Sequence, residues 1–307
     1  MAKMSTPLRD LLIVAVVAAG VLPMDGLVLN NCDLSLAGTE SGDVTLRSFS
    51  ALHGGIGPDC RLTIQNPDYN LPWSGDDDIA GQLIVYGGVQ WDAARTNLGV
   101  IDVQDGFVIG PIFNRGLVRL RANTIFGAPG GHLDLGGVVD VDADARARID
   151  AQSATVSGVI RLRPTNVTFN PIGQYQLSLL SGDCTIDGAT LELEPGPGFA
   201  PAWGRVYNLI GASVVHGSFA EVIATTPLPN PRWRWELRRH NNTHFRGHIV
   251  HVADVNRDLF VDELDVSAIL AAWHTSTSGP EDVNGDGFVD FADLAIVVAH
   301  FGQSAFG

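Results

Sequence analysis

The chain has 307 residues, 45% of them hydrophobic and 17% charged, so it is long enough for two ordinary domains with buried cores and is not a disordered segment. It contains 35 glycines and only 7% aromatic residues, which favours an all-β protein with many tight turns over a helical bundle. The formal net charge is −15 and there is no basic tract, which argues against nucleic acid as a partner and favours cations.

The first residues have the features of an export signal. Lys3 and Arg9 precede an apolar run over residues 11–22, the usual charge and length pattern of a secretory signal peptide. Asp10 beside the run leaves an uncleaved anchor open, although the run is short for a membrane span. We therefore predict a signal peptide over residues 1–26, a secreted or cell-surface location, and no membrane span once the signal is removed.

Three cysteines, Cys32, Cys60 and Cys184, leave two alternatives open. In an exported protein Cys32 and Cys60 are candidates for a disulfide bond, with Cys184 as a free thiol. Three unconnected thiols are the other alternative. The sequence has no C-x-x-C pair or Cys/His cluster that indicates zinc.

Short apolar runs recur after glycines in the segment 27–250. The runs are GQLIVY from Gly81, GVIDV from Gly99, GLVRL from Gly116, GHLDL from Gly131 and GVIRL from Gly158. The first four of these glycines are 18, 17 and 15 residues apart. This recurrence predicts a β-solenoid domain over residues 27–250, in which each rung stacks on the previous one and buries one face. An antiparallel sandwich of short strands is the alternative.

The end of this segment carries a loose resemblance. Residues 191–222, LELEPGPGFAPAWGRVYNLIGASVVHGSFAEV, follow the order strand, Pro/Gly turn, strand, strand. In that order they resemble the closing segment of secreted bacterial β-solenoids of the autotransporter-passenger type. The resemblance implies the architecture and no activity.

The clearest alternation of apolar and charged residues is VVDVDADARARID, residues 138–150. Its charged face holds Asp140, Asp142, Asp144, Arg146, Arg148 and Asp150. Calcium-dependent polysaccharide lyases use aspartates beside arginines to hold a uronate and remove its proton, so a lyase site is one hypothesis. The other is a solvated outer face with salt bridges. In a solenoid this length of chain turns a corner, so the aspartates need not converge.

The segment 231–239, PRWRWELRR, alternates Trp233, Trp235 and Leu237 with charged residues. It is either an aromatic and basic platform for an anionic glycan or a strand whose tryptophans cap the open end of the core. Downstream, His240, His244, His248 and His251 have a spacing that would suit a metal site on a helix. Gly247 and the β-branched neighbours favour a strand instead, which divides the histidines between two faces.

The segment 251–307 holds ten acidic residues and one basic residue, and it repeats a twelve-residue pattern 28 residues apart: DVNRDLFVDELD and DVNGDGFVDFAD. Each copy has acidic or amide side chains at positions one, three, five, nine and twelve, which is the ligand spacing of a calcium loop, and position seven supplies a backbone carbonyl. The predicted ligands are Asp254, Asn256, Asp258, Phe260, Asp262 and Asp265 in the first loop, and Asp282, Asn284, Asp286, Phe288, Asp290 and Asp293 in the second. Oxygen donors of this kind predict Ca²⁺ at two sites.

Each loop is followed by apolar residues at i, i+3, i+4 and i+7, which predicts an amphipathic helix. The two sets are Val266, Ile269, Leu270 and Trp273, and Leu294, Val297, Val298 and Phe301. The sequences before the loops, RGHIVHVA and TSTSGPE, do not favour helices. We therefore predict a small all-α module, residues 251–307, made of two calcium loop–helix (F-hand) repeats.

The doubled motif over residues 254–302 resembles a type I dockerin module. The resemblance implies two loop–helix units related by a pseudo-twofold axis, one calcium ion held in each by the ligands named above, and binding to a cohesin domain. Dockerins of this family often tether polysaccharide-degrading enzymes to a scaffold.

Two features depart from that family pattern. Leu259 stands at the sixth position of the first loop, where glycine is expected, so the second loop is predicted to bind calcium more strongly. Positions ten and eleven, a small polar pair that meets the cohesin in this family, are Glu263 and Leu264 in the first loop and Phe291 and Ala292 in the second. The calcium chemistry therefore transfers, whereas the identity of the partner does not follow.

Together these features predict an exported calcium-binding protein. Its dockerin-like module would serve attachment at the cell surface or in extracellular polysaccharide-handling complexes, and the solenoid would be a structural or glycan-contacting body. The predicted partners are a cohesin-like protein or cell-surface component and a polysaccharide. The alternative is a polysaccharide lyase or glycoside hydrolase carried on the β-helix, for which the sequence offers no convincing pair of catalytic carboxylates. A free adhesin with a vestigial dockerin would share the predicted fold.

Overall fold

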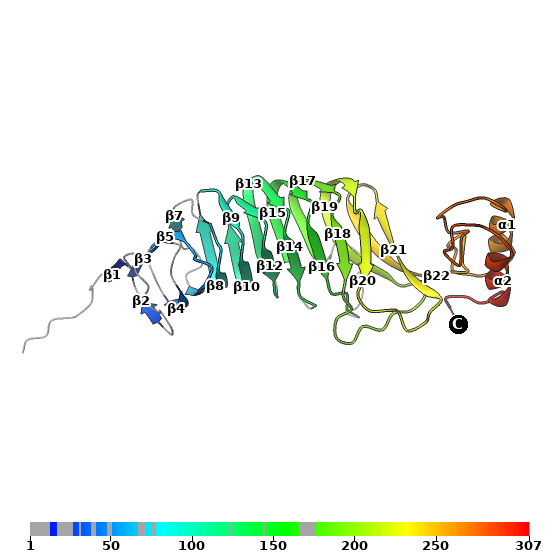
Figure 1. Ribbon diagram of the computed structural model, residues 1–307, viewed down its shortest axis with the longest axis horizontal. Helices are drawn as coiled ribbons and strands as arrows, with labels where there is room; N and C mark the ends of the chain where they lie inside the picture. The colour runs from blue at the N-terminus through cyan, green and yellow to red at the C-terminus, as the bar shows by residue number, and fades with distance from the viewer. Residues whose placement is uncertain are drawn as a thin grey trace, which may run out of the picture.

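The computed structural model describes residues 13–16, 27–30, 32–37, 41–47, 51–66, 72–74, 78–91, 93–122, 124–143, 145, 147–165 and 176–306. These residues form an elongated β-solenoid with two short helices beyond its C-terminal end (Figure 1). The prediction of a mainly β protein with a solenoid body is therefore confirmed. Among the described residues, no helix is long and apolar enough to cross a membrane.

The strands of the described residues join in one sheet that winds around the solenoid and gives it three faces. The first face is built from β2 (Leu27–Asn30), β4 (Gly42–Arg47), β6 (Cys60–Asn66), β12 (Leu117–Leu120), β14 (Val138–Val141), β16 (Val159–Leu162), β18 (Thr190–Leu193) and β20 (Glu221–Ala224), with the first halves of β8 (Gln82–Trp91) and β10 (Val100–Ile109).

The second and third faces share several long strands that bend at a corner. The second face contains β1 (Ile13–Val16), β3 (Cys32–Ala37), β5 (Ala51–Gly55), β7 (Pro72–Ser74), the second halves of β8 and β10, and the first halves of β13 (Ile125–Leu135), β15 (Ala147–Val156), β17 (Leu177–Asp187) and β19 (Val206–Ser218). The third contains β9 (Arg95–Asn97), β11 (Ile112–Asn114) and the second halves of β13, β15, β17 and β19. All of these pairings are parallel, as stacking of successive rungs requires.

The solenoid core consists of aligned columns of apolar side chains. On the first face the strand register superposes Val44, Leu62, Leu83, Ile101, Val118, Val139, Ile160 and Leu191. All of them are buried. Because side chains alternate along a strand, the residues between these columns point outward and form a second column on the surface.

The glycine recurrence marks one corner of the solenoid, but one of its members was assigned wrongly. Gly81, Gly99, Gly116, Gly137 and Gly158 stack on one another, and a Cβ on each of the last four would lie 2.0–2.2 Å from the carbonyl oxygen of the glycine one rung below. The fourth member is thus Gly137 and not Gly131, which lies within β13 on another part of the rung. The prediction failed there because rungs differ in length, so an approximate period does not identify the equivalent residue.

The C-terminal end of the solenoid is closed by a hairpin of β21 (Trp233–His240) and β22 (His244–His251). β22 pairs antiparallel with both β19 and β21, which ends the parallel stacking. Trp235 and Leu237 pack against the solenoid core, and Trp235 stacks on Phe199 with 5.8 Å between ring centroids. Of the two alternatives for the segment 231–239, the structure therefore supports the capping strand.

Beyond the hairpin lie α1 (Glu263–Ala271) and α2 (Phe291–Ala299), each at the position predicted after a loop. Ile269 and Val297 are fully buried in a second core with Val255, Val261, Val283 and Val289. Trp203 and Trp233 of the solenoid belong to this second core as well. The core of this C-terminal module therefore includes solenoid residues as well as residues of its own loops and helices.

Of the predicted signal segment, the structure describes only residues 13–16, which pair with β3. The side chain of Cys32 lies outside the described residues, so both alternatives for Cys32 and Cys60 stay open. Cys184 is a free, buried cysteine whose pKa is raised to about 12 by burial. A thiol this hard to ionise is a core side chain and not a nucleophile.

Candidate calcium-binding loops

The first loop is folded around the carboxylates at its first and last positions. Asp254 accepts hydrogen bonds from the N–H groups of Asp258 and Leu259 at 3.1 and 3.2 Å. Asp265 accepts from those of Val255 and Asn256 at 2.6 and 3.0 Å. The ligand positions one, three, five and twelve are thus drawn into one hydrogen-bonded turn.

The second loop repeats these hydrogen bonds at the equivalent positions. Asp282 accepts from the N–H groups of Asp286 and Gly287 at 3.0 and 2.9 Å, and Asp293 accepts from those of Val283 and Asn284 at 2.7 and 3.0 Å. In both loops the side-chain amide at position three donates to the carboxylate at position five at 2.9 Å. The sequence duplication is therefore a structural duplication.

Both loops require left-handed backbone at positions four and six. In the second loop these are Gly285 and Gly287, with φ of 78° and 90°. In the first they are Arg257 and Leu259, with φ of 65° and 77°. Left-handed backbone costs a residue with a Cβ about 1 kcal/mol, so the first loop carries the strain predicted for Leu259. Arg257 is a second strained residue, which was not predicted.

The ninth-position aspartates take a different role from the others. Asp262 and Asp290 are the N-caps of α1 and α2, and their carboxylates accept from the N–H groups of Leu264 and Ala292 at 2.8 and 2.7 Å. Asp265 and Asp293 complete each capping box by accepting from the N-cap N–H at 2.9 Å. These caps explain why the helices begin where they do.

Four carboxylates of the loops, Asp254, Asp265, Asp282 and Asp293, are buried. Burial raises the pKa of Asp254, and the neighbouring charge of Asp265 acts in the same direction. Among the residues that the structure describes, no three or more His, Cys, Asp or Glu side chains gather as a bound metal ion requires, and the loop carboxylates are turned to backbone N–H groups. The donor chemistry nevertheless suits a hard cation, because buried carboxylates call for a compensating positive charge.

In each loop–helix unit, the segment that follows the helix pairs with the loop of the other unit. The segment after α1 pairs with the second loop through a bridge between Ser276 and Phe288, and the segment after α2 pairs with the first loop through a bridge between Phe260 and Ser304. Phe260 and Phe288, predicted to offer only backbone carbonyls, are 46% and 54% exposed.

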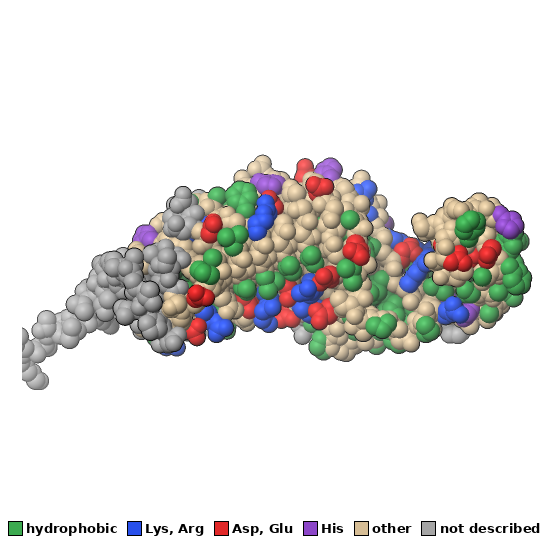
Figure 2. Space-filling model, viewed as in Figure 1, with side chains coloured by type: hydrophobic (Ala, Val, Ile, Leu, Met, Phe, Trp, Pro, Cys, Tyr) green, Lys and Arg blue, Asp and Glu red, His purple; other side chains and the backbone are tan. Residues whose placement is uncertain are grey.

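The helices bury less of their apolar stripe than predicted. Leu270 and Val298 are 54% and 56% exposed, although the i+4 position was expected to face the core. A nine-residue helix packed along one narrow line buries Ile269 and Val297 and leaves the next position outside. Figure 2 shows apolar side chains along the outer side of this end of the molecule.

The first loop also contacts the solenoid, through residues that no motif in the sequence marks. Trp203 Nε1 donates to Asp254 Oδ2 at 3.3 Å, and Arg257 Nε donates to Glu236 Oε2 at 2.7 Å. The signal that would have revealed the second contact is position four, where Arg257 stands against Gly285 in the other copy. The second loop has no arginine at this position.

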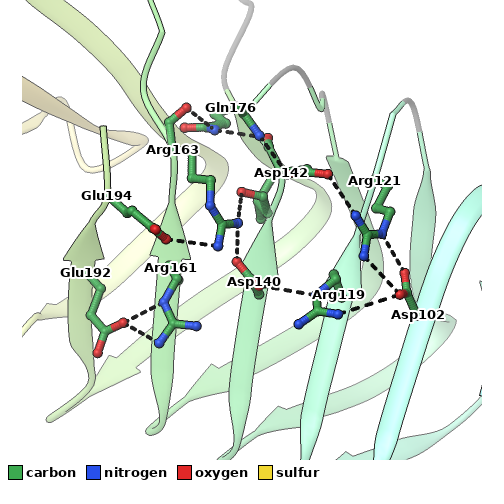
Figure 3. Close-up of polar contacts among 12 residues, drawn as sticks. Asp102, Arg119, Arg121, Asp140, Asp142, Arg161, Arg163, Gln176, Glu192 and Glu194 are labelled. Carbon is green, nitrogen blue, oxygen red and sulfur yellow. Dashed lines mark hydrogen bonds and ion pairs between the residues drawn. The ribbon is translucent and has the colours of Figure 1, made fainter. Parts of the chain in front are cut away.

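The aspartates of the lyase hypothesis belong to a ladder of ion pairs on the first face (Figure 3). Asp140 contacts Arg119 at 3.4 Å and also Arg163, and Asp142 contacts Arg121 at 3.2 Å. The strand ends at Val141 and the chain then turns, as the alternative expected. Asp144 and Arg146 lie outside the described residues, and Arg148 is exposed on β15. Asp140 and Asp142 are thus paired with arginines, as in the salt-bridged alternative, but the Asp140 side chain is buried and not solvated.

The histidines lie on a hairpin and not on a helix. His244, His248 and His251 are in β22, where the alternation of side chains puts His251 on the opposite face from the other two. His240 and His244 face each other across the hairpin with 4.9 Å between ring centroids. This confirms the predicted strand.

The fold and the site define the chain as a β-solenoid that ends in two loop–helix units with duplicated, carboxylate-centred loops. Comparison with protein-family models, with curated proteins and with solved structures finds no match for this chain.

Proposed function

We propose that this chain is an exported calcium-binding protein whose C-terminal, dockerin-like module attaches it to a partner at the cell surface or in an extracellular polysaccharide-handling complex. The solenoid is its structural or glycan-contacting body. Each loop takes one Ca²⁺ ion through the ligands predicted from the sequence. The observation that carries the proposal is the duplicated loop with its pair of buried carboxylates, Asp254 with Asp265 and Asp282 with Asp293.

Calcium supplies the positive charge that these carboxylates otherwise lack and offsets the cost of burying them. The second loop is the stronger site, because its two left-handed positions are glycines and the same backbone costs nothing there. Asp286 and Asp258, the fifth-position ligands of the two loops, each belong to one site only.

Isothermal titration of the full chain with Ca²⁺ tests this directly. We expect two sites, with the tighter one lost in Asp286→Ala and the weaker one lost in Asp258→Ala, because each substitution removes a charged ligand from one loop. Glu221→Ala is the matched control, since Glu221 is an exposed acid on β20, outside both loops. A full chain that takes up no calcium, or an Asp286→Ala curve identical to the wild type, would contradict the proposal.

The surface proposed for attachment is the outer face of α2. Phe291 and Val298 are 72% and 56% exposed and stand seven residues apart, about two helical turns, so they share one face. Ala295 between them is exposed too. The corresponding residues on α1 are Glu263, Ser267 and Leu270, so the two helices present different surfaces despite their duplication.

Attachment is tested with the immobilised full chain against a panel of cohesin domains, with calcium and with a chelator. We expect calcium-dependent binding that falls about tenfold or more in Phe291→Ser, since an exposed aromatic at the centre of an interface is a frequent hot spot. Phe113→Ser, at an aromatic residue that is 44% exposed on the solenoid, is the control and should leave binding unchanged. Equal binding under chelation, or no binding to any cohesin, would refute this mode of attachment.

A further inference from the structure

The first loop and the second loop differ in what surrounds them. The hydrogen bonds that the Asp282 carboxylate accepts come from its own loop, from the N–H groups of Gly285, Asp286 and Gly287. The Asp254 carboxylate accepts from its own loop and also from Trp203 Nε1 of the solenoid. Trp203 is 8% exposed and Asp254 is fully buried, so this contact is closed to water.

A second contact fixes the backbone of the first loop. Arg257 bridges the solenoid and the loop: its Nε donates to Glu236 Oε2 at 2.7 Å, and its Nη1 donates to the carbonyl oxygen of Asp254. Its side chain is 11% exposed. Glu236 is held in turn by Arg238, whose Nε donates to Oε1 at 2.6 Å. The pKa of Glu236 is lowered: burial opposes the shift, and the hydrogen bonds from Arg238 and Arg257 outweigh it.

The third contact involves the other strained residue. Leu259 packs in the second core, which includes Trp203. It also lies over Gly204, where a Cβ would stand 3.4 Å from Leu259 Cδ2. Both residues that replace glycine in the first loop, Arg257 and Leu259, therefore contact the solenoid with their side chains. Contacts of this kind are what a left-handed arginine or leucine needs to persist.

We propose that the solenoid completes the first loop: Trp203 and Glu236 are positioning residues that hold Asp254 and the loop backbone in place, so that the calcium affinity of this loop depends on the solenoid. The inference rests on the proposed calcium binding and deepens it. In the second loop the Asp282 carboxylate accepts its hydrogen bonds from its own loop, and the capping strand acts on it through the charge of Arg234. Calcium in the first loop then also fastens the helical module to the end of the solenoid, because the same carboxylate serves the ion and Trp203.

The test is calcium titration of the full chain in the Asp286→Ala background, where the first site is measured alone. Trp203→Phe keeps an aromatic ring and removes the N–H donor, and Glu236→Gln keeps the size and removes the charge. Each should weaken the first site about tenfold or more, as loss of a group that orients a metal ligand does. In the Asp258→Ala background the same two substitutions should leave the second site unchanged.

Two matched controls and a double-mutant cycle separate positioning from a general loss of stability. Trp273→Phe, in the same core, and Glu192→Gln, in the ion-pair ladder, should leave the first site as it is. In an Arg257→Gly background, Glu236→Gln should have no further effect on affinity, since its partner is gone.

The outcomes distinguish this inference from the proposed function. A wild-type chain that takes up no calcium overturns both. A wild-type chain with two sites, of which the first keeps its affinity in Trp203→Phe and Glu236→Gln, overturns only this inference. Equal weakening of both sites also overturns it, because that result indicates a global effect.

Discussion

At the scale of single residues, the strained positions of the first loop show how one copy of a duplicated motif diverges. Gly285 and Gly287 adopt left-handed backbone with nothing within 4 Å of a Cβ placed on them. Arg257 and Leu259 adopt the same backbone and use their side chains to contact the solenoid. The first loop thus has a more strained backbone than the second, and the two strained residues attach it to the solenoid.

The environment of a charged residue on the solenoid likewise depends on its neighbours on adjacent rungs more than on its residue type. Asp102 and Asp140 have side chains that are only 5% and 3% exposed, and each is contacted by two arginines. The partners come from rungs 17–23 residues away, so they cannot be read from the local alternation. Removing one of these arginines would leave a buried carboxylate with less compensating charge, so the pairs constrain how neighbouring rungs can stack.

His248 gives the residue-scale prediction, a dependence of stability on pH. The ring lies on the central strand of the end cap, and burial, then the charge of Arg238, lowers its pKa to about 4, with Glu236 acting the other way and Arg246 in the same direction. An unfolded histidine titrates near pH 6.5. Between these values the unfolded state binds more protons, so the free energy of unfolding falls as the pH falls from about 6.5 to about 4.

His248→Gln should reduce this loss by about 1 kcal/mol, a value discounted because the ring is only half buried and water screens its charge. The measurement is denaturant unfolding at about pH 7 and about pH 5. His216→Gln, at an exposed histidine on β19, is the control. An unchanged difference between the two pH values in His248→Gln would show that the ring does not titrate as described.

At the scale of the elements, the corner glycines set how closely the rungs stack. A Cβ on Gly116 would lie 2.2 Å from the carbonyl oxygen of Gly99, and that neighbour is backbone, which cannot rotate away. Gly116→Ala should therefore destabilise the chain by about 2–3 kcal/mol, through forced displacement of a packed rung.

Gly188→Ala is the matched variant for that measurement. Gly188 has φ of 65° and nothing within 4 Å of its Cβ position, so the substitution meets only backbone strain of about 1 kcal/mol. Both variants are compared with the wild type by denaturant unfolding. If the two cost the same, close rung stacking at the corner is not what requires glycine at Gly116.

The sequence predicted the elements with local signals and missed what depends on distant ones. The solenoid, both loops and the presence of a helix after each loop follow from short-range patterns of apolar and acidic residues. The equivalence of Gly137 with Gly116 was missed because rung lengths vary with the corner loops. No local sequence pattern predicts that Arg95 is fully buried, with its guanidinium carbon 4.4 Å from the centroid of the Trp73 ring on another rung.

The candidate site divides in the same way. The loop residues that we propose as calcium ligands were selected from spacing alone, whereas the contacts of Trp203 and Glu236 with the first loop join residues 51 and 21 positions apart. The exposure of Leu270 and Val298 was missed as well, because the i, i+3, i+4, i+7 pattern does not say how wide a surface the helix meets.

At the scale of the whole molecule, each rung touches mainly its neighbours, so the solenoid is stable only if its ends are covered. The hairpin of β21 and β22 covers the C-terminal end, and its outer side carries the helical module. Trp235 faces the solenoid core and Trp233 the second core, so one strand joins the two. Figure 1 shows this order, with the hairpin between the rungs and the helices.

Trp235 therefore tests whether the chain behaves as a one-dimensional stack. Its ring packs on Phe199 and Tyr207, with centroids 5.8 and 5.3 Å apart, and Trp235→Ala should cost about 3–5 kcal/mol as a large cavity at the cap. Hydrogen exchange should then rise in β19, β21 and β22 and stay unchanged in β8 to β14, since distant rungs share no contact with the cap. Trp91→Phe, which loses its hydrogen bond to Pro111 in the middle of the stack, is the reciprocal control and should raise exchange there and not at the cap. A rise spread evenly over all rungs in Trp235→Ala would mean that the solenoid unfolds as one cooperative unit, and that the cap stabilises the whole stack and not its end alone.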